Sequence, residues 1–487
     1  MNNSKKQVVI GVFWSGIQMV VNQSFSFLIR LVLAKLLFPE QFGLVGMATV
    51  VTGFVQVIND IGVGAALVQR KDDDLKPIHF YTAFWTGVAW SIILYLIVSF
   101  ILGPLAATFY NQPILLKLIP VLSIGILASP VNMVHKAQLT KALNFKKITL
   151  IDNLSNVVAG CAALVMAFMG GGVWSLAFNS IASIIIAMPL FFKATGWKPK
   201  MHWEKQAFKE IFGFGMFTTG TNIINYLIDN VDYLLIGKLV SASALGSYTL
   251  AFVLTDTFRS RLMSVINNVM YPVYSKSQGD LGLIKNYYLK VIQYNSLIIY
   301  PIMTFFIIFG GELITFAFGD VWHDTLLPLR VLSGAVMVHM LVNSNTVLIR
   351  GLGKPQLELK LQVLKSVIFI PMLFVGIYNW GIIGASWAIL INKVIAVIIA
   401  QYTFNKLLNI KITTNEFIET MKVPLIGSAL SGFAGYLLLR ININFILGGI
   451  AIALIYIGIV ILFMRKEIQT TISKFKKPRQ EKQWQSI

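Results

Sequence analysis

Long apolar stretches recur along the chain from close to the N-terminus to about residue 464. Each can form a helix of at least about 18 residues, the length that crosses a hydrocarbon layer roughly 30 Å thick. The polar segments between these stretches are short, and none is long enough for a sizeable soluble domain. The pattern therefore predicts an all-α polytopic membrane protein.

We expect fourteen transmembrane spans, at residues 9–36, 41–66, 78–102, 114–134, 148–169, 172–192, 208–236, 243–266, 287–309, 325–348, 361–379, 382–403, 422–440 and 443–464. Residues 33–48 align without gaps with residues 236–251, so Gly43 coincides with Gly246 at an offset of 203. An even number of crossings separates the two copies, which therefore run in the same direction. This repeat predicts two six-helix lobes around a central cavity, as in transporters, at 1–205 and 206–405. Two more helices at 406–464 and a basic cytoplasmic tail at 465–487 would follow.

The composition supports this interpretation, because 56% of the 487 residues are hydrophobic and only 12% are charged, whereas soluble proteins carry about 25% charged residues. The net charge of +20 could suggest a nucleic-acid partner, but the cations concentrate in alternate connections. By the positive-inside rule, this asymmetry places both termini and the 135–147 loop in the cytoplasm. The charge therefore indicates topology and some attraction to membrane lipids, and no nucleic-acid partner is expected.

Two motifs in residues 60–74 look enzymatic at first sight. Gly62 and Gly64 could begin a phosphate-binding loop, but the third glycine of G-x-G-x-x-G is absent, so we interpret them as small residues for close helix packing. Asp72, Asp73 and Asp74 could bind a metal, but no α/β domain surrounds them; we expect them to cap the next helix. With a single cysteine, Cys161, and no P-loop or metal-ligand spacing, we expect no cofactor and no metal.

Charged residues inside the predicted spans are the best candidates for function, because burying charge in a membrane is costly. The cationic excess indicates an anionic cargo, and the candidates for binding it are Arg30, Arg259 and Lys393. The candidates for ion coupling are Asp229, Asp232, Asp256 and His339. The structural alternative is internal ion pairing, for example of Arg30 with Asp229 or Asp232, and a hydrogen-bonded structural role for His339.

Several stretches resemble a known family: "INDIGVGAALVQRKD" at 58–72, "NYLIDNVDYLLIGKLVSASALGSYTLAF" at 225–252, "MYPVYSKSQ" at 270–278, "FGDVWHDTLLPLRVLS" at 318–333 and "GLGKP" at 351–355. They are similar to the polysaccharide-transporter branch of the multidrug/oligosaccharidyl-lipid/polysaccharide superfamily, and above all to the Wzx-type flippases. The resemblance implies alternating access and translocation of undecaprenyl-diphosphate-linked oligosaccharide. In the related lipid II flippases, arginines of spans 1, 2 and 8 surround the cargo diphosphate; Arg30 and Arg259 stand near such positions, whereas span 2 has no arginine.

The sequence and the resemblance thus favour a flippase of the bacterial inner membrane that is not an enzyme. Its expected partners are lipid-linked oligosaccharide and membrane lipids. Polysaccharide polymerase and chain-length machinery are further candidate partners. Two alternatives stay open. A multidrug or cation antiporter of the same superfamily would have a cavity dominated by carboxylates and aromatic residues. A membrane-bound glycosyltransferase or polymerase is disfavoured because the predicted outer connections are short.

The predicted topology can be tested by cysteine labelling in a Cys161→Ala background. Cysteines introduced singly at Lys141 and Asp320 should be labelled from opposite sides of the membrane, because the positive-inside assignment places only Asp320 outside. The measurement is reaction with an impermeant maleimide added to intact cells. Labelling of both positions from outside would contradict the topology.

Overall fold

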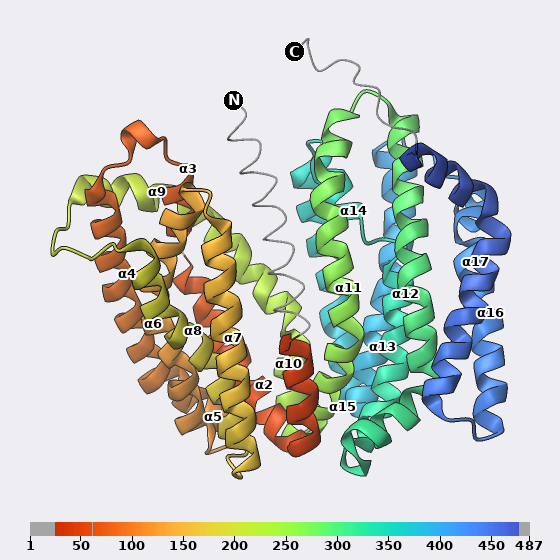
Figure 1. Ribbon diagram of the computed structural model, residues 1–487, viewed down its shortest axis with the longest axis horizontal. Helices are drawn as coiled ribbons and strands as arrows, with labels where there is room; N and C mark the ends of the chain where they lie inside the picture. The colour runs from red at the N-terminus through yellow and green to blue at the C-terminus, as the bar shows by residue number, and fades with distance from the viewer. Residues whose placement is uncertain (1–24, 61, 477–487) are drawn as a thin grey trace. The chain divides into compact units, whose positions relative to one another are not determined.

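The computed structural model describes residues 25–60 and 62–476, which divide into two compact units (Figure 1). Unit 1 contains the chain up to Leu250 together with Ala317–Thr325 and Leu373–Ala385. Unit 2 contains Ala251–Phe316, Leu326–Met372 and the chain from Ser386 onward. The described residues form helices and turns and contain no strand, which confirms the predicted all-α class.

The helices of unit 1 follow a helical stretch at residues 25–36. They are α2 (Pro39–Asn59), α3 (Val63–Gln69), the short 3₁₀ turn η1 (Asp72–Asp74), α4 (Pro77–Ile97), the π-helical turn η2 (Val98–Leu102), α5 (Gly103–Tyr110), α6 (Leu115–Lys141), α7 (Phe145–Phe168), α8 (Val173–Thr195), α9 (Lys205–Asp229) and α10 (Val231–Leu239). The elements α4, η2 and α5 form one rod, so the predicted third span continues past residue 102.

The core of unit 1 forms where α6 packs against α4 and α8, which lie side by side in Figure 1. Leu67 of α3, Ala83 of α4 and Val134 of α6 are at most 1% exposed, and Ile211 of α9 joins the same cluster. Gly64 also faces α6, because a Cβ atom added there would lie 3.3 Å from Met133 Cγ. The predicted close packing is thus confirmed at Gly64, whereas Gly62 has the left-handed backbone conformation that precedes α3.

Unit 2 is built from longer helices, some of which begin in unit 1 or pass through it. They are α11 (Ala242–Lys276), α12 (Leu281–Phe318), the 3₁₀ turn η3 (Asp320–Thr325, in unit 1), α13 (Leu326–His339), α14 (Asn345–Gly351), α15 (Pro355–Tyr402), the π-helical turn η4 (Thr403–Leu407), α16 (Thr414–Arg440) and α17 (Phe445–Lys476). The chain turns within α15 at Gly381, whose φ of 56° is left-handed. Gly376 and Gly384 approach so closely there that neither could accept a Cβ atom without a shift.

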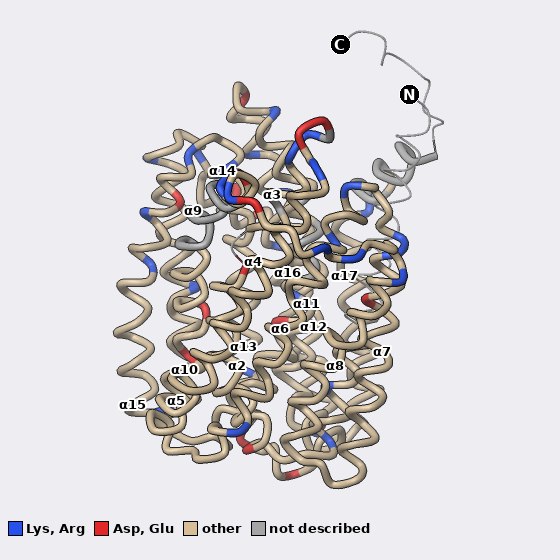
Figure 2. Tube along the Cα trace, turned by 90° about the vertical axis from the view of Figure 1, so that its left-hand side faces the viewer, with Lys and Arg blue, Asp and Glu red and all other residues tan. Residues whose placement is uncertain are grey.

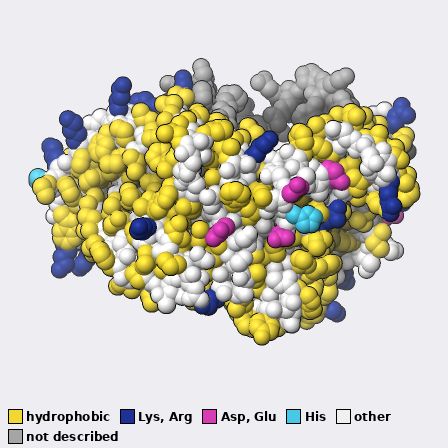
Figure 3. Space-filling model, turned by 90° about the horizontal axis from the view of Figure 1, so that it is seen from below, with side chains coloured by type: hydrophobic (Ala, Val, Ile, Leu, Met, Phe, Trp, Pro, Cys, Tyr) yellow, Lys and Arg dark blue, Asp and Glu magenta, His cyan; other side chains and the backbone are white. Residues whose placement is uncertain are grey.

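Nine of the described helices are long and apolar enough to cross a membrane. The protein is therefore a multi-pass membrane protein. Lysine and arginine lie mainly near helix ends, while the middle of the helices is mostly uncharged (Figure 2). The face seen in Figure 3 is largely apolar and shows a few acidic side chains near a histidine.

Two expectations from the sequence are wrong. The residues Asp72–Asp74 do not cap the next helix, because α4 begins after Lys76, whose backbone N–H donates to His79 Nδ1 at 2.9 Å. The tenth span, expected to be continuous over 325–348, is interrupted by turns between His339 and Asn345. Neither departure could be predicted from hydrophobicity, since both depend on specific hydrogen bonds of polar side chains. The expected first span lies partly outside the described residues, as do residues 477–487 of the tail.

The repeat at an offset of 203 has a counterpart in the packing of unit 1. A Cβ atom added to Gly43 of α2 would overlap the carbonyl oxygen of Ala242, at the start of α11. One added to Gly246 of α11 would overlap the carbonyl oxygen of Pro39, at the start of α2. In the repeat, Pro39 corresponds to Ala242 and Gly43 to Gly246, so each contact mirrors the other. A local two-fold relation between two parallel segments produces this reciprocity.

We predict that Gly43→Ala and Gly246→Ala each destabilise the protein by about 1–3 kcal/mol, because the methyl group must push a backbone carbonyl aside. The measurement is the midpoint of thermal unfolding of the purified protein in detergent. Gly458→Ala is the matched control, since a Cβ atom there meets open space and alanine favours helix. Wild-type stability of either crossing variant would contradict the reciprocal packing.

Candidate functional site

Basic side chains from two long helices of unit 2 lie within Coulombic range of His339, the last residue of α13. They are Arg259, Lys365 and Lys393. The two lysines belong to α15, and Arg259 belongs to α11. We call Arg259, Lys365 and Lys393 the cationic group. Positive charge gathered within an apolar helical protein is costly unless anions compensate it, so this group is a candidate anion site.

One member of the cationic group already has an anionic neighbour. Arg259 Nε donates to Asp256 Oδ1 at 2.8 Å, and its terminal nitrogen contacts the same oxygen. The two residues are three positions apart on α11, and each side chain is 24% exposed. The structural alternative raised from the sequence, an internal ion pair, is therefore present at Arg259. This carboxylate occupies a position that another anion could take.

The predicted cargo-binding residues fall in both units. Arg259 and Lys393 lie near the same imidazole in unit 2, whereas Arg30 lies in unit 1 at an exposed position of the helical stretch 25–36. The ion-coupling candidates divide in the same way: Asp256 and His339 belong to unit 2, and Asp229 and Asp232 belong to unit 1.

Sequence reasoning missed Lys365 as a site residue. It lies only four residues inside the predicted span 361–379, where a lysine can belong to the adjoining connection. Its surroundings in "LQVLKSVIF" are apolar, and that was the available signal. In the structure it is half-buried and faces the region of His339.

Asp232 forms a second polar centre, in unit 1. Its side chain is buried, with the residue 6% exposed. Tyr248 Oη donates to Oδ2 at 2.7 Å, and the backbone N–H of Tyr233 donates to Oδ1 at 2.9 Å. A tyrosine hydroxyl can donate to a carboxylate or accept from a carboxylic acid. The contacts of Asp232 are therefore compatible with a carboxyl group that gains and loses a proton.

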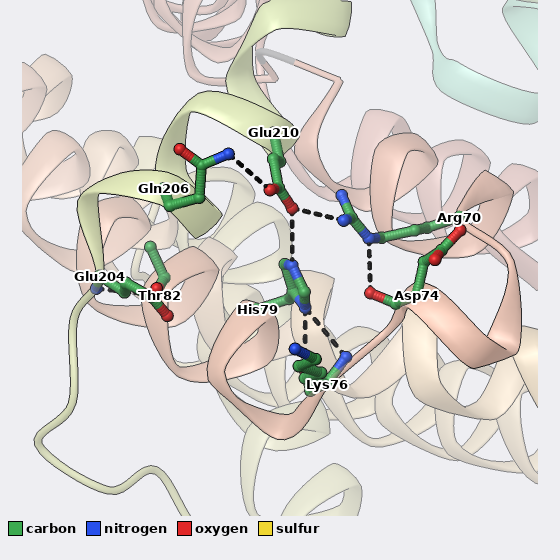
Figure 4. A network of polar contacts seen from close by, with 8 residues as sticks. All are labelled: Arg70, Asp74, Lys76, His79, Thr82, Glu204, Gln206 and Glu210. Carbon is green, nitrogen blue, oxygen red and sulfur yellow. Dashed lines mark hydrogen bonds and ion pairs between the residues drawn. The ribbon is translucent and has the colours of Figure 1, made fainter.

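The segment that looked enzymatic is part of a third polar network (Figure 4). Glu210 of α9 is ion-paired with Arg70, contacts His79 Nε2 at 3.1 Å and accepts from Gln206 at 2.8 Å. Arg70 Nε also donates to the carbonyl oxygen of Asp74 at 2.8 Å. His79 Nδ1 faces the backbone of Lys76, and Nε2 faces Glu210. The network joins the end of the second span, the start of α4 and the start of α9, so its role is structural.

Among the described residues, no three His, Cys, Asp or Glu side chains are grouped so that they could hold a metal ion. The arrangement instead offers positive charge and hydrogen-bond donors in unit 2 and a buried carboxyl group in unit 1. These are groups that bind and release anions and protons.

Comparison with known families decides the classification. Residues 32–327, more than half of the chain, match the model of a family described as polysaccharide biosynthesis proteins. The chain belongs to this family. Within it, the chain is 24% identical over 446 residues to the teichuronic acid biosynthesis protein TuaB of Bacillus subtilis, with 90% of both chains covered. It is also 24% identical over 408 residues to the lipopolysaccharide biosynthesis protein WzxC of Escherichia coli, with 82% of both covered.

The fold also has a counterpart among solved structures. The lipid II flippase MurJ in an inward closed conformation superposes with a TM-score of 0.74, over 94% of this chain and 100% of that one, at 13% sequence identity. This polysaccharide biosynthesis family member therefore has the fold of a membrane flippase. The family resemblance seen in the sequence is confirmed.

Proposed function

We propose that the protein is a flippase that moves undecaprenyl-diphosphate-linked oligosaccharide across the cytoplasmic membrane by alternating access. The oligosaccharide would be a repeat unit of O-antigen, capsule or exopolysaccharide. The observation that carries the proposal is the cationic group around His339, in a chain of the polysaccharide biosynthesis family with the fold of a lipid II flippase. The protein does no covalent chemistry in this account.

The proposed mechanism rests on exchange of anions at Arg259. A guanidinium stays charged and presents paired N–H donors that match phosphate oxygens. The cargo diphosphate would displace Asp256 from Arg259 and add contacts to Lys393. Arg30 of unit 1 is proposed separately as a further cargo-binding residue. The sugar would be carried with the diphosphate, and the prenyl chain would remain in lipid. Binding of cargo would thus free a carboxylate inside the protein.

Such a freed carboxylate suggests how transport could couple to protons. Asp256 would become unpaired when cargo binds, and protonation would lower the cost of leaving it in an apolar environment. Asp232 is supported as a second candidate by its hydrogen bond to Tyr248, and Asp229 and His339 complete the proposed ion-coupling set. The membrane potential acting on the charged cargo would be a further driving force.

We also propose the full topology of fourteen helices with both termini in the cytoplasm. Nine spans are among the described helices that meet length and hydropathy limits. One of these, α15, turns at Gly381 and would supply two spans. The remaining four would be the span that includes 25–36, the pair α9 and α10, the helix α11, and the interrupted pair α13 and α14. The lobes would lie at 1–205 and 206–405. Polysaccharide polymerase and chain-length machinery would receive the cargo outside.

Two other functions are less well supported. A drug or cation antiporter would need a cavity dominated by carboxylates and aromatic residues, whereas three cations lie within Coulombic range of His339. A glycosyltransferase or polymerase would need a paired catalytic constellation, and the family and fold are those of transporters.

We predict that Arg259→Lys impairs export although the charge is kept, because an ammonium cannot form the paired N–H contacts of guanidinium. A loss of about tenfold corresponds to one charge-assisted hydrogen bond. Arg261→Lys, two residues further along α11, is the matched control and should export normally. The measurement is surface polysaccharide in a deletion strain, with protein levels matched by blotting. Normal export by Arg259→Ala would contradict the proposed role of Arg259 in cargo binding.

A further inference from the structure

The interruption of the tenth span has a specific hydrogen-bonding pattern. After α13 ends at His339, the N–H groups of Leu341 and Val342 donate to the carbonyls three residues earlier, each at 3.1 Å, before α14 begins at Asn345. Irregular backbone at membrane depth is tolerated only where protein or a water-filled cavity satisfies its polar groups. We call residues 340–344 the break.

Tyrosines of the neighbouring helices satisfy one side of the break. Tyr288 Oη of α12 lies 3.0 Å from the carbonyl oxygen of Leu341 and 2.7 Å from Asn345 Oδ1. Tyr300 Oη, also of α12, donates to the carbonyl oxygen of Met337 at 3.1 Å. Tyr274 Oη of α11 lies 3.1 Å from Ser344 Oγ. This side of the break is fixed by protein contacts and has no need of a ligand.

Two other polar groups, one in the break and one next to it, are different. Asn343 Nδ2 of the break and Nδ1 of the preceding His339 are buried and have no hydrogen-bond partner among the described residues. Buried polar atoms without partners are rare in folded proteins and indicate an unseen water, ion or ligand. An amide nitrogen is a donor, and an imidazole carries at least one N–H donor in either protonation state. The neighbouring cationic group adds further donors and positive charge, together with the carboxylates of Asp256 at Arg259 and of Glu358 near Lys365.

We propose that the break binds the diphosphate of the lipid-linked cargo, with Asn343 and His339 donating to phosphate oxygens and Lys365 joining Lys393 and Arg259 in charge compensation. This inference rests on the proposed flippase function and adds three residues to it. A doubly charged anion with several acceptor oxygens matches a site made of cations and N–H donors. A neutral sugar or a cationic drug does not.

The place of the break along the chain fits the first step of transport. Asn343 is seven residues from Arg350, or about 10 Å along a helix at 1.5 Å per residue. The turn that follows contains Lys354 and belongs to the proposed cytoplasmic side. The break therefore lies in the half of the membrane that a headgroup enters from the cytoplasmic leaflet.

Two asparagine-to-aspartate substitutions test the assignment on opposite sides of the break. Asn343→Asp replaces a donor with an anion, so it should weaken binding of geranylgeranyl diphosphate to the purified full-length protein by about tenfold or more. Asn345→Asp keeps the oxygen that contacts Tyr288 and should bind within about twofold of wild type. The measurement is ligand titration by native mass spectrometry in detergent.

A second pair of variants, each of which removes one positive charge, keeps the assignment testable if Asn343→Asp misfolds. Lys365→Gln should weaken binding of geranylgeranyl diphosphate, whereas Lys360→Gln, an exposed lysine on the same helix, should not. Inorganic pyrophosphate and geranylgeranyl monophosphate are the comparison ligands, and both should bind more weakly than the prenyl diphosphate. Equal binding of free pyrophosphate would mean a site for soluble anions and would overturn the assignment to lipid-linked cargo.

The outcomes separate this inference from the proposed function. If wild type binds the prenyl diphosphate and both Asn343→Asp and Lys365→Gln bind as wild type, the break is not the site, and the flippase function stands. If Asn343→Asp loses binding and export, while Asn345→Asp keeps both, the inference holds. If Asn343→Asp loses binding but exports normally, the site does not serve transport. If wild type does not bind the prenyl diphosphate, both proposals fail.

Discussion

The cost of polar groups in hydrocarbon governs this structure. Each backbone N–H and C=O at membrane depth must be paired within the protein, and each charge must find compensation. Helical hydrogen bonds pair the backbone groups along most of the chain. Between α13 and α14, tyrosine hydroxyls contact backbone carbonyl oxygens instead. The second requirement is met by Asp256 at Arg259. Arg259, Lys365 and Lys393 lie within Coulombic range of His339, and in the proposed function an anionic cargo complements their charge.

The same constraint explains how much the sequence could predict. Apolar length predicted the helical membrane fold, whereas the side on which each helix end lies stays a prediction from the spacing of cations. The repeat aligns Gly43 with Gly246, and in the structure the two glycines make equivalent close contacts, with the carbonyl oxygens of Ala242 and Pro39. Intramembrane charge pointed to Arg259, Lys393 and His339, which lie near one another. These features depend on which residues each helix contains and on the order of those residues along the chain.

What the sequence could not predict depends on side chains that reach between helices. His79 caps its own helix and contacts Glu210, 131 residues away, so the nearer aspartates looked like the caps. The break after His339 is tolerated because Tyr288 and Tyr300 of α12 accommodate its carbonyls. Lys365 faces His339 because of the path of α15, which hydrophobicity does not specify. Each is a contact whose partner is remote in sequence.

The central claim, transport of a completed lipid-linked oligosaccharide, is tested most directly in a strain lacking the gene. The account predicts that the complete undecaprenyl-diphosphate-linked repeat unit accumulates and that impermeant periodate added to intact cells leaves its sugars unoxidised. Lipid extraction and mass spectrometry measure both amount and oxidation. Incomplete glycans would indicate a transferase, complete units oxidised from outside would indicate a polymerase, and absence of any lipid-linked intermediate would contradict the flippase function.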